Sequence, residues 1–142
     1  MKQLIIFLLT LLFMVSCSEP KLFESIESTH EDGTPKIVKF YKDESKETLV
    51  KETRYWENGH KSMEGTYKNG NRDGKWTAWY IDGTIWSSGE YTDGIENGLK
   101  VVYHNTGQKY YEGEIKDDKR IGTWKFWDKD GAFVKEIDYN KK

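Results

Sequence analysis

The chain has 142 residues, of which 36% are hydrophobic, 32% are charged and 15% are aromatic, and its formal net charge is −2. This length suits one domain or a short repeat array. Because basic and acidic residues are interleaved, the chain offers no continuous basic surface that could neutralise phosphates, which argues against nucleic acid as a partner.

The first 16 residues have the pattern of an export signal. Lys2 supplies a positive charge, and residues 4–15 form an apolar run that only Thr10 interrupts. Such a run is shorter than the ~20 residues of a membrane-spanning helix and has the length of a signal-peptide core. We therefore expect residues 1–16 to be a signal peptide.

Residues 14–17, Met-Val-Ser-Cys, resemble the lipobox of bacterial lipoproteins, in which a peptidase cleaves before a cysteine that then carries diacylglycerol. The resemblance implies that Cys17 is lipidated, with acyl groups such as palmitate, and that these hold the mature chain at a membrane. Cys17 is the only cysteine, so no disulfide can form within the chain. An uncleaved anchor or a plain secretory signal are the alternatives.

The position after Cys17 bears on the location in the cell envelope. In Gram-negative lipoproteins an aspartate there retains the protein at the inner membrane, and this chain has Ser18. A lipid-anchored envelope protein is therefore expected, with the outer membrane favoured if the source is Gram-negative. Residues 17–29 are expected to comprise the lipidated cysteine and a flexible tether, with an edge strand allowed at 22–26.

Residues 30–139 are predicted to form one repeat array with a period of 24 residues, followed by a tail at 140–142. A fixed period of this size marks units that are too small to bury their own apolar surface. Three glycine series keep this period: Gly59, Gly83, Gly107 and Gly131; Gly65, Gly89 and Gly113; Gly74, Gly98 and Gly122. Gly33 precedes Gly59 by 26 residues, which indicates a two-residue insertion within 42–50.

Each unit is predicted to be a β-hairpin, because Asn-Gly and Asp-Gly turns separate segments rich in Tyr, Trp, Thr and Val. The first regular unit is a strand at 60–67, a loop at 68–74, a strand at 75–80 and a turn at 81–83. The later strands are expected at 84–91, 99–103, 108–115, 123–127 and 133–139.

Large rings occur on both faces of these strands. In the strand at 75–80, Trp76 and Tyr80 alternate with Trp79, so neither face is purely polar. This pattern predicts an all-β fold, a single-layer twisted antiparallel meander of hairpins. Gly65, Gly89 and Gly113 fall in mid-strand, where a missing side chain makes room for a ring from the adjacent strand.

The segments Tyr55-Trp-Glu-Asn-Gly59, Glu64-Gly-Thr-Tyr-Lys-Asn-Gly70 and Gly122-Thr-Trp-Lys-Phe-Trp127 resemble the MORN repeat. They are most similar to the bacterial variant grouped as the YwqK-like antitoxin family. The resemblance implies an elongated β-array that contacts lipids, scaffolds or dimerises, and the antitoxin label implies a cytoplasmic toxin as partner. A rival is the choline-binding type of cell-wall repeat, whose period is nearer 20 and whose characteristic Gly-Trp pair is missing here.

No pattern for catalysis, for a metal or for a cofactor is present in the sequence. The histidines His30, His60 and His104 are interpreted as surface residues beside turns. Glu64 and Glu112 are two units apart, ~20 Å by strand spacing, which is too far for the carboxylate pair of a glycoside hydrolase.

These observations favour a non-enzymatic envelope lipoprotein that acts as a binding or scaffolding module. The hypothesised partner is an envelope protein or a glycan, in addition to the membrane reached through the N-terminal lipid, and an oligomer is compatible with the sequence. An antitoxin-like role and a cell-wall glycan-binding repeat remain as alternatives. The candidate binding-face aromatics are Trp76, Trp86, Tyr110 and Trp124.

Overall fold

The computed structural model describes residues 21–141 of the chain. The expected signal peptide and the lipidation site Cys17 lie outside the described residues. Within the described range the chain forms one open antiparallel sheet of eleven strands, and it contains no helix. The prediction of an all-β, single-layer meander of hairpins is confirmed.

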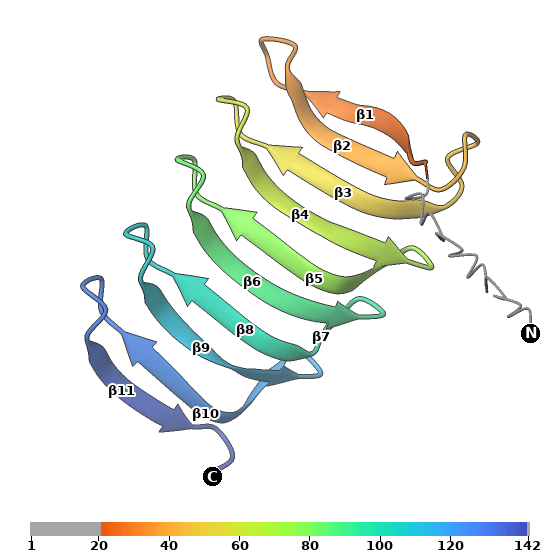
Figure 1. The fold of residues 1–142 in the computed structure, drawn as a ribbon. Helices are drawn as coiled ribbons and strands as arrows, with labels where there is room; N and C mark the ends of the chain where they lie inside the picture. Colours follow the sequence, from red (N-terminus) through yellow and green to blue (C-terminus); the bar gives the residue numbers. More distant parts are fainter. Residues whose placement is uncertain (1–20, 142) are drawn as a thin grey trace, which may run out of the picture.

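The strands follow one another along the sheet in chain order, apart from the short β7, which pairs with β6 beside β8. Figure 1 shows the hairpin turns along two sides of the sheet, with β1 and β11 at opposite ends. The strands are β1 (Phe23–Thr29), β2 (Pro35–Tyr41), β3 (Leu49–Tyr55), β4 (Lys61–Lys68), β5 (Asn71–Trp79), β6 (Ile85–Thr92), β7 (Ile95–Glu96), β8 (Gly98–Tyr103), β9 (Lys109–Lys116), β10 (Lys119–Trp127) and β11 (Phe133–Asp138).

The hairpin between β4 and β5 is tighter than predicted. The sequence analysis placed a loop at 68–74, but β5 already begins at Asn71 and only Asn69 and Gly70 form the turn. Both turn residues have positive φ, 52° and 81°, as a two-residue turn of type I′ requires. Gly74, with φ 86°, lies inside β5 at a register shift. It belongs to a β-bulge, in which glycine adopts a positive φ as it does in a turn.

The turns on the other side of the sheet are longer and repeat the same backbone hydrogen bonds. In the first of them, Trp56 N donates to His60 O at 2.8 Å, and Gly59 N donates to Trp56 O at 2.9 Å. The bonds recur one unit later, from Tyr80 N to Thr84 O and from Gly83 N to Tyr80 O. This regularity explains why the 24-residue period is visible in the sequence.

The N-terminal part of the sheet begins earlier than the expected array. Strand β1 occupies residues 23–29, which the sequence analysis assigned to the tether except for an edge strand allowed at 22–26. The seven-residue connection 42–48 between β2 and β3 lies where the two-residue insertion was predicted. The first unit thus keeps the hairpin plan but closes with a wider loop.

Candidate functional site

The register of the strands places residues 76, 100 and 124 on one face of the sheet, which we call the tryptophan face. Trp76 pairs with Gly65 on one side and with Gly89 on the other, and Lys100 pairs with Gly113. A Cβ added at Gly65 would lie 2.1 Å from the Trp76 ring, and one added at Gly113 would lie 2.3 Å from the Trp124 ring. These rings therefore lie directly on the glycines of the preceding strands, as predicted.

In two units an arginine completes this arrangement. The guanidinium carbon of Arg72 lies 3.9 Å from the centroid of Trp76, and that of Arg120 lies 4.4 Å from the centroid of Trp124. Each indole N–H also donates to a backbone carbonyl, to Thr66 O at 3.1 Å and to Glu114 O at 3.2 Å respectively. Glycine, tryptophan and arginine thus form a repeated stack that covers the sheet backbone without leaving the indole N–H unpaired.

The unit between these two, residues 84–103, which we call the central unit, departs from this plan at the positions of both the arginine and the tryptophan. Glu96 stands where its neighbours have arginine, and Lys100 stands where they have tryptophan. Lys100 Nζ donates to Glu96 Oε1 at 2.7 Å, and the two side chains are 23% and 17% exposed. Glu96 Oε1 also occupies the space beside Gly89, since a Cβ there would lie 2.3 Å from it. An ion pair therefore replaces a stacked ring, and the prediction that a ring fills the space beside Gly89 was wrong.

Two hollows open where this ring is missing. The larger has a volume of about 560 Å³ and the smaller about 210 Å³, and both are lined by Trp86, Ser87 and Lys100. Aromatic side chains form most of the rest of the larger hollow's wall, among them Tyr80, Tyr110 and Tyr111, together with Val102. The site is an open depression with aromatic walls and a polar floor.

β-Bulges aim Trp86 and Tyr110 at this depression. Ala78 pairs with Ser87 and Trp79 pairs with Ile85, so Trp86 is an additional residue in its strand. The register shift between Val102 and Tyr103 makes Tyr110 the additional residue of β9 in the same way. A bulge interrupts the regular alternation of side chains between the two faces of a strand. Here the bulges direct the rings of Trp86 and Tyr110 towards the depression.

The four aromatic residues predicted for the binding face divide into two pairs. Trp76 and Trp124 are 5% and 1% exposed, so their rings form the core of the array and offer little surface to a partner. Trp86 and Tyr110 are 47% and 45% exposed. The depression brings this second pair together, because both rings line the larger hollow.

Sequence reasoning missed Lys100 and Glu96. The signal was present in the 24-residue series 52, 76, 100 and 124, which reads Glu, Trp, Lys and Trp. A repeat is recognised by the residues that recur, and Lys100 and Glu96 are the residues at which the central unit breaks the repeat.

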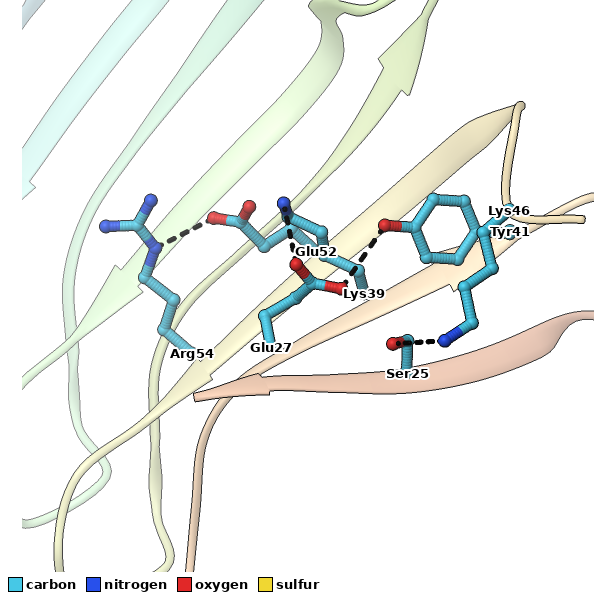
Figure 2. A network of polar contacts seen from close by, with 7 residues as sticks. All are labelled: Ser25, Glu27, Lys39, Tyr41, Lys46, Glu52 and Arg54. Atoms are coloured by element: carbon cyan, nitrogen blue, oxygen red, sulfur yellow. Dashed lines mark hydrogen bonds and ion pairs between the residues drawn. The ribbon is translucent and has the colours of Figure 1, made fainter. Parts of the chain in front are cut away.

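At the N-terminal end of the sheet, polar contacts replace the stacked rings (Figure 2). Arg54 Nε donates to Glu52 Oε1 at 2.8 Å, and Glu52 is buried. Lys39 Nζ lies 3.4 Å from Glu27 Oε2. Burial raises the pKa of Glu27, but the charge of Lys39 and further hydrogen bonds outweigh it, so this pKa is lowered overall. Lys46 Nζ donates to Ser25 Oγ at 2.9 Å in the same network. Arg54 also lines a separate hollow of about 440 Å³ at this end of the sheet.

The three histidines bridge neighbouring turns. His30 Nε2 lies 3.1 Å from Tyr55 O, His60 Nδ1 lies 3.1 Å from Ile81 O, and His104 Nε2 lies 3.0 Å from Trp127 O. Each contact joins a turn or loop to the corresponding part of the next unit. The position beside turns matches the sequence interpretation, and the contacts assign these residues to holding adjacent units in register.

Residues 21–141 contain no cluster of three or more His, Cys, Asp or Glu side chains arranged to hold a metal ion. In the same part of the chain, no helix is long and apolar enough to cross a membrane.

Neither a protein-family model nor a curated protein matches the chain. One solved structure to which the chain is similar is the crystal structure of TarM, with a TM-score of 0.46 and 19% sequence identity. The similarity covers 84% of this chain and 21% of that chain, so this chain spans about a fifth of the length of TarM. A likeness of this size carries no argument about function.

Proposed function

We propose that this chain is a non-catalytic binding module of the cell envelope, which presents Trp86 and Tyr110 to a macromolecular partner. The observation that carries the proposal is the exposure of these two rings over one depression of an open sheet. Amphipathic rings with a polar floor between them are a common means of holding a ligand without reacting with it.

The repeat architecture supports the same proposal. An extended sheet made of similar units offers a long surface, and binding surfaces of repeat proteins are built in this manner. The MORN-like pattern of glycines and aromatic residues agrees with a scaffolding or contact role. Trp76 and Trp124 then support the surface from within, and the exposed pair provides the contact.

Site-specific crosslinking in native envelopes tests this proposal. Tyr110 is replaced by p-benzoylphenylalanine, which keeps an aromatic ring at the depression, and Glu90, an exposed residue of β6, is replaced in a matched control. We expect illumination to give a discrete crosslinked product from position 110 and none from position 90. Equal products from both positions, or none from either, would contradict the proposal.

We also propose that the chain reaches the envelope as a lipoprotein acylated at Cys17. Support comes from the lipobox-like residues 14–17 and from the apolar run before them. The test is metabolic labelling with a palmitate analogue, with Cys17→Ala as the control. We expect the label to be incorporated into the wild-type chain alone, and equal labelling of the two chains would rule out Cys17 as the acylated residue.

A further inference from the structure

The central unit combines two departures from the repeat that act on the same place. Lys100 stands in place of the ring that would cover Gly89, and its side chain lines both hollows. In the bulge series 62, 86, 110 and 134 the residues are Ser, Trp, Tyr and Val, so large rings occur only in the two units whose bulges flank Lys100. The two exposed rings, Trp86 and Tyr110, therefore flank the unit that has no covering tryptophan, and this combination favours a binding site there.

The chemistry of the depression indicates its ligand. Trp86 and Tyr110 are one unit apart, about 10 Å at the usual strand spacing. Ser87 and Lys100 line the floor between them, and the Lys100 ammonium has three N–H donors, of which it gives one to Glu96 at 2.7 Å. Successive sugar rings of an oligosaccharide present apolar C–H faces for stacking and hydroxyl groups for such a floor.

We propose that the depression binds a neutral oligosaccharide, with one sugar on Trp86, another on Tyr110, and hydroxyl groups towards Lys100 and Ser87. The inference rests on the proposed function and specifies its ligand. A neutral ligand is favoured because the charge of Lys100 is already balanced by Glu96 within the site. An anionic ligand would have to compete with that carboxylate for the ammonium.

A protein partner fits the depression less well. The centre of a protein–protein interface is depleted in Lys, Glu and Ser, because burying them under an apolar surface removes their hydration. Here Lys100 and Ser87 lie at the centre of the site, and Glu96 pairs with the lysine. The hydroxyl groups of a sugar can replace the water that these side chains lose.

Calorimetric titration of the full-length chain in detergent tests the inference. The probes are neutral hexasaccharides of β-1,4-linked glucose, α-1,4-linked glucose and β-1,4-linked N-acetylglucosamine, with a hexamer of galacturonic acid as the anionic comparison. We expect at least one neutral probe to bind, and to bind more tightly than the anionic one. Failure of every neutral probe at millimolar concentration, or tighter binding of the anionic probe, would overturn the inference.

Variants locate the binding. Trp86→Ala and Tyr110→Ala are each expected to weaken binding about tenfold, from the loss of one stacked ring. Trp56→Ala is the matched control, since Trp56 is also an exposed ring beside a turn but lines a different hollow. Equal losses in Trp56→Ala and Trp86→Ala would overturn the assignment to the depression.

Lys100→Trp separates binding from folding, because it restores the ring of the neighbouring units and removes the lysine side chain that lines both hollows. We expect it to abolish hexasaccharide binding while circular dichroism shows an intact sheet, and retained affinity in this folded variant would also overturn the inference. A crosslink from position 110 to a protein, with no hexasaccharide bound, would refute the oligosaccharide and leave the proposed binding function standing.

Discussion

At the residue scale, the single layer is held by contacts in which a tryptophan lies on a glycine of the neighbouring strand. Trp124 is almost fully buried although the sheet has no second layer, because Gly113 lies under its ring and Arg120 lies above it. A ring of this size buries ~150–250 Å² and contributes most where its polar N–H is satisfied. The glycine is therefore required by close approach, and no other residue leaves enough room.

The first prediction concerns this close approach. Gly113→Ala should lower the free energy of unfolding by about 1–3 kcal/mol, because the new methyl group would overlap the Trp124 ring. Gly89→Ala should cost less, since its Cβ would meet the flexible ends of Glu96 and Lys100. Urea denaturation of both variants checks the order, and an equal or larger loss in Gly89→Ala would contradict it.

Glu64 accepts several polar contacts on the face opposite the tryptophan face. Its Oε2 accepts hydrogen bonds from Thr53 Oγ1 at 2.9 Å and from Lys61 Nζ at 2.8 Å, and Lys51 Nζ lies 3.0 Å away. Burial raises the pKa of this carboxyl, but the hydrogen bonds of Lys61, Lys51 and Thr53 outweigh burial. The pKa therefore lies below its ordinary value of 4.5.

The second prediction follows from the sign of this shift. A lowered pKa means that the folded state favours ionised Glu64, so its contribution is present above the unfolded pKa and is lost as pH falls through the folded pKa. Glu64→Gln should therefore remove part of the stability loss that the wild type shows between about pH 5 and pH 3. Unfolding free energies measured across this range test it, and identical pH slopes in both proteins would exclude Glu64 as a source.

At the element scale, the hairpins differ in how well their turn residues suit the backbone. Asn69-Gly70 suits a turn in which both residues have positive φ, whereas Lys46, in the loop between β2 and β3, has φ 60° without being glycine. The same loop is organised by Asp43, whose pKa is lowered to about 2 by hydrogen bonds from Ser45, the Glu47 backbone and Thr48. Lys46 is therefore a strained residue within an otherwise well-bonded loop.

The third prediction is that Lys46→Gly stabilises the protein by up to about 1 kcal/mol, because glycine adopts positive φ without steric cost. The bond lost from Lys46 Nζ to Ser25 Oγ is exposed and contributes little. Lys42→Gly, in the same loop but outside the residues with positive φ, should destabilise instead. Thermal unfolding of the two variants checks the contrast, and a lower Tm for Lys46→Gly would refute it.

The elements that the sequence predicts well are those whose cause is local. Strand positions follow from alternation and turn residues, and the covering of Gly65 and Gly113 follows from their place in mid-strand. The prediction of a loop at 68–74 was wrong because Gly74 lies in a bulge. Glycine with a positive φ is typical of bulges and of turns alike, so the sequence does not distinguish them. Burial of Trp76 and exposure of Trp86 depend on bulge geometry and on neighbouring strands, which alternation alone does not determine.

At the scale of the whole molecule, the array is a series of similar hairpins, and in two of them a tryptophan of the second strand covers a glycine of the first. Residues 72, 96 and 120 are Arg, Glu and Arg, and residues 76, 100 and 124 are Trp, Lys and Trp. In our account the central unit gives up a stabilising stack in order to keep an open binding depression. Partly buried ion pairs are often no more stabilising than packed side chains in their place. Binding sites commonly lower the stability of the fold in this way.

The most direct test of this account is the free energy of unfolding of the double variant Glu96→Arg with Lys100→Trp, measured by urea denaturation against the wild type. The variant gives the central unit the arginine–tryptophan stack of its neighbours and removes the lysine side chain that lines both hollows. The account predicts an increase of about 1–3 kcal/mol. A decrease would show that the ion pair, and not a missing ring, is the stable arrangement at this place, and would contradict the central claim.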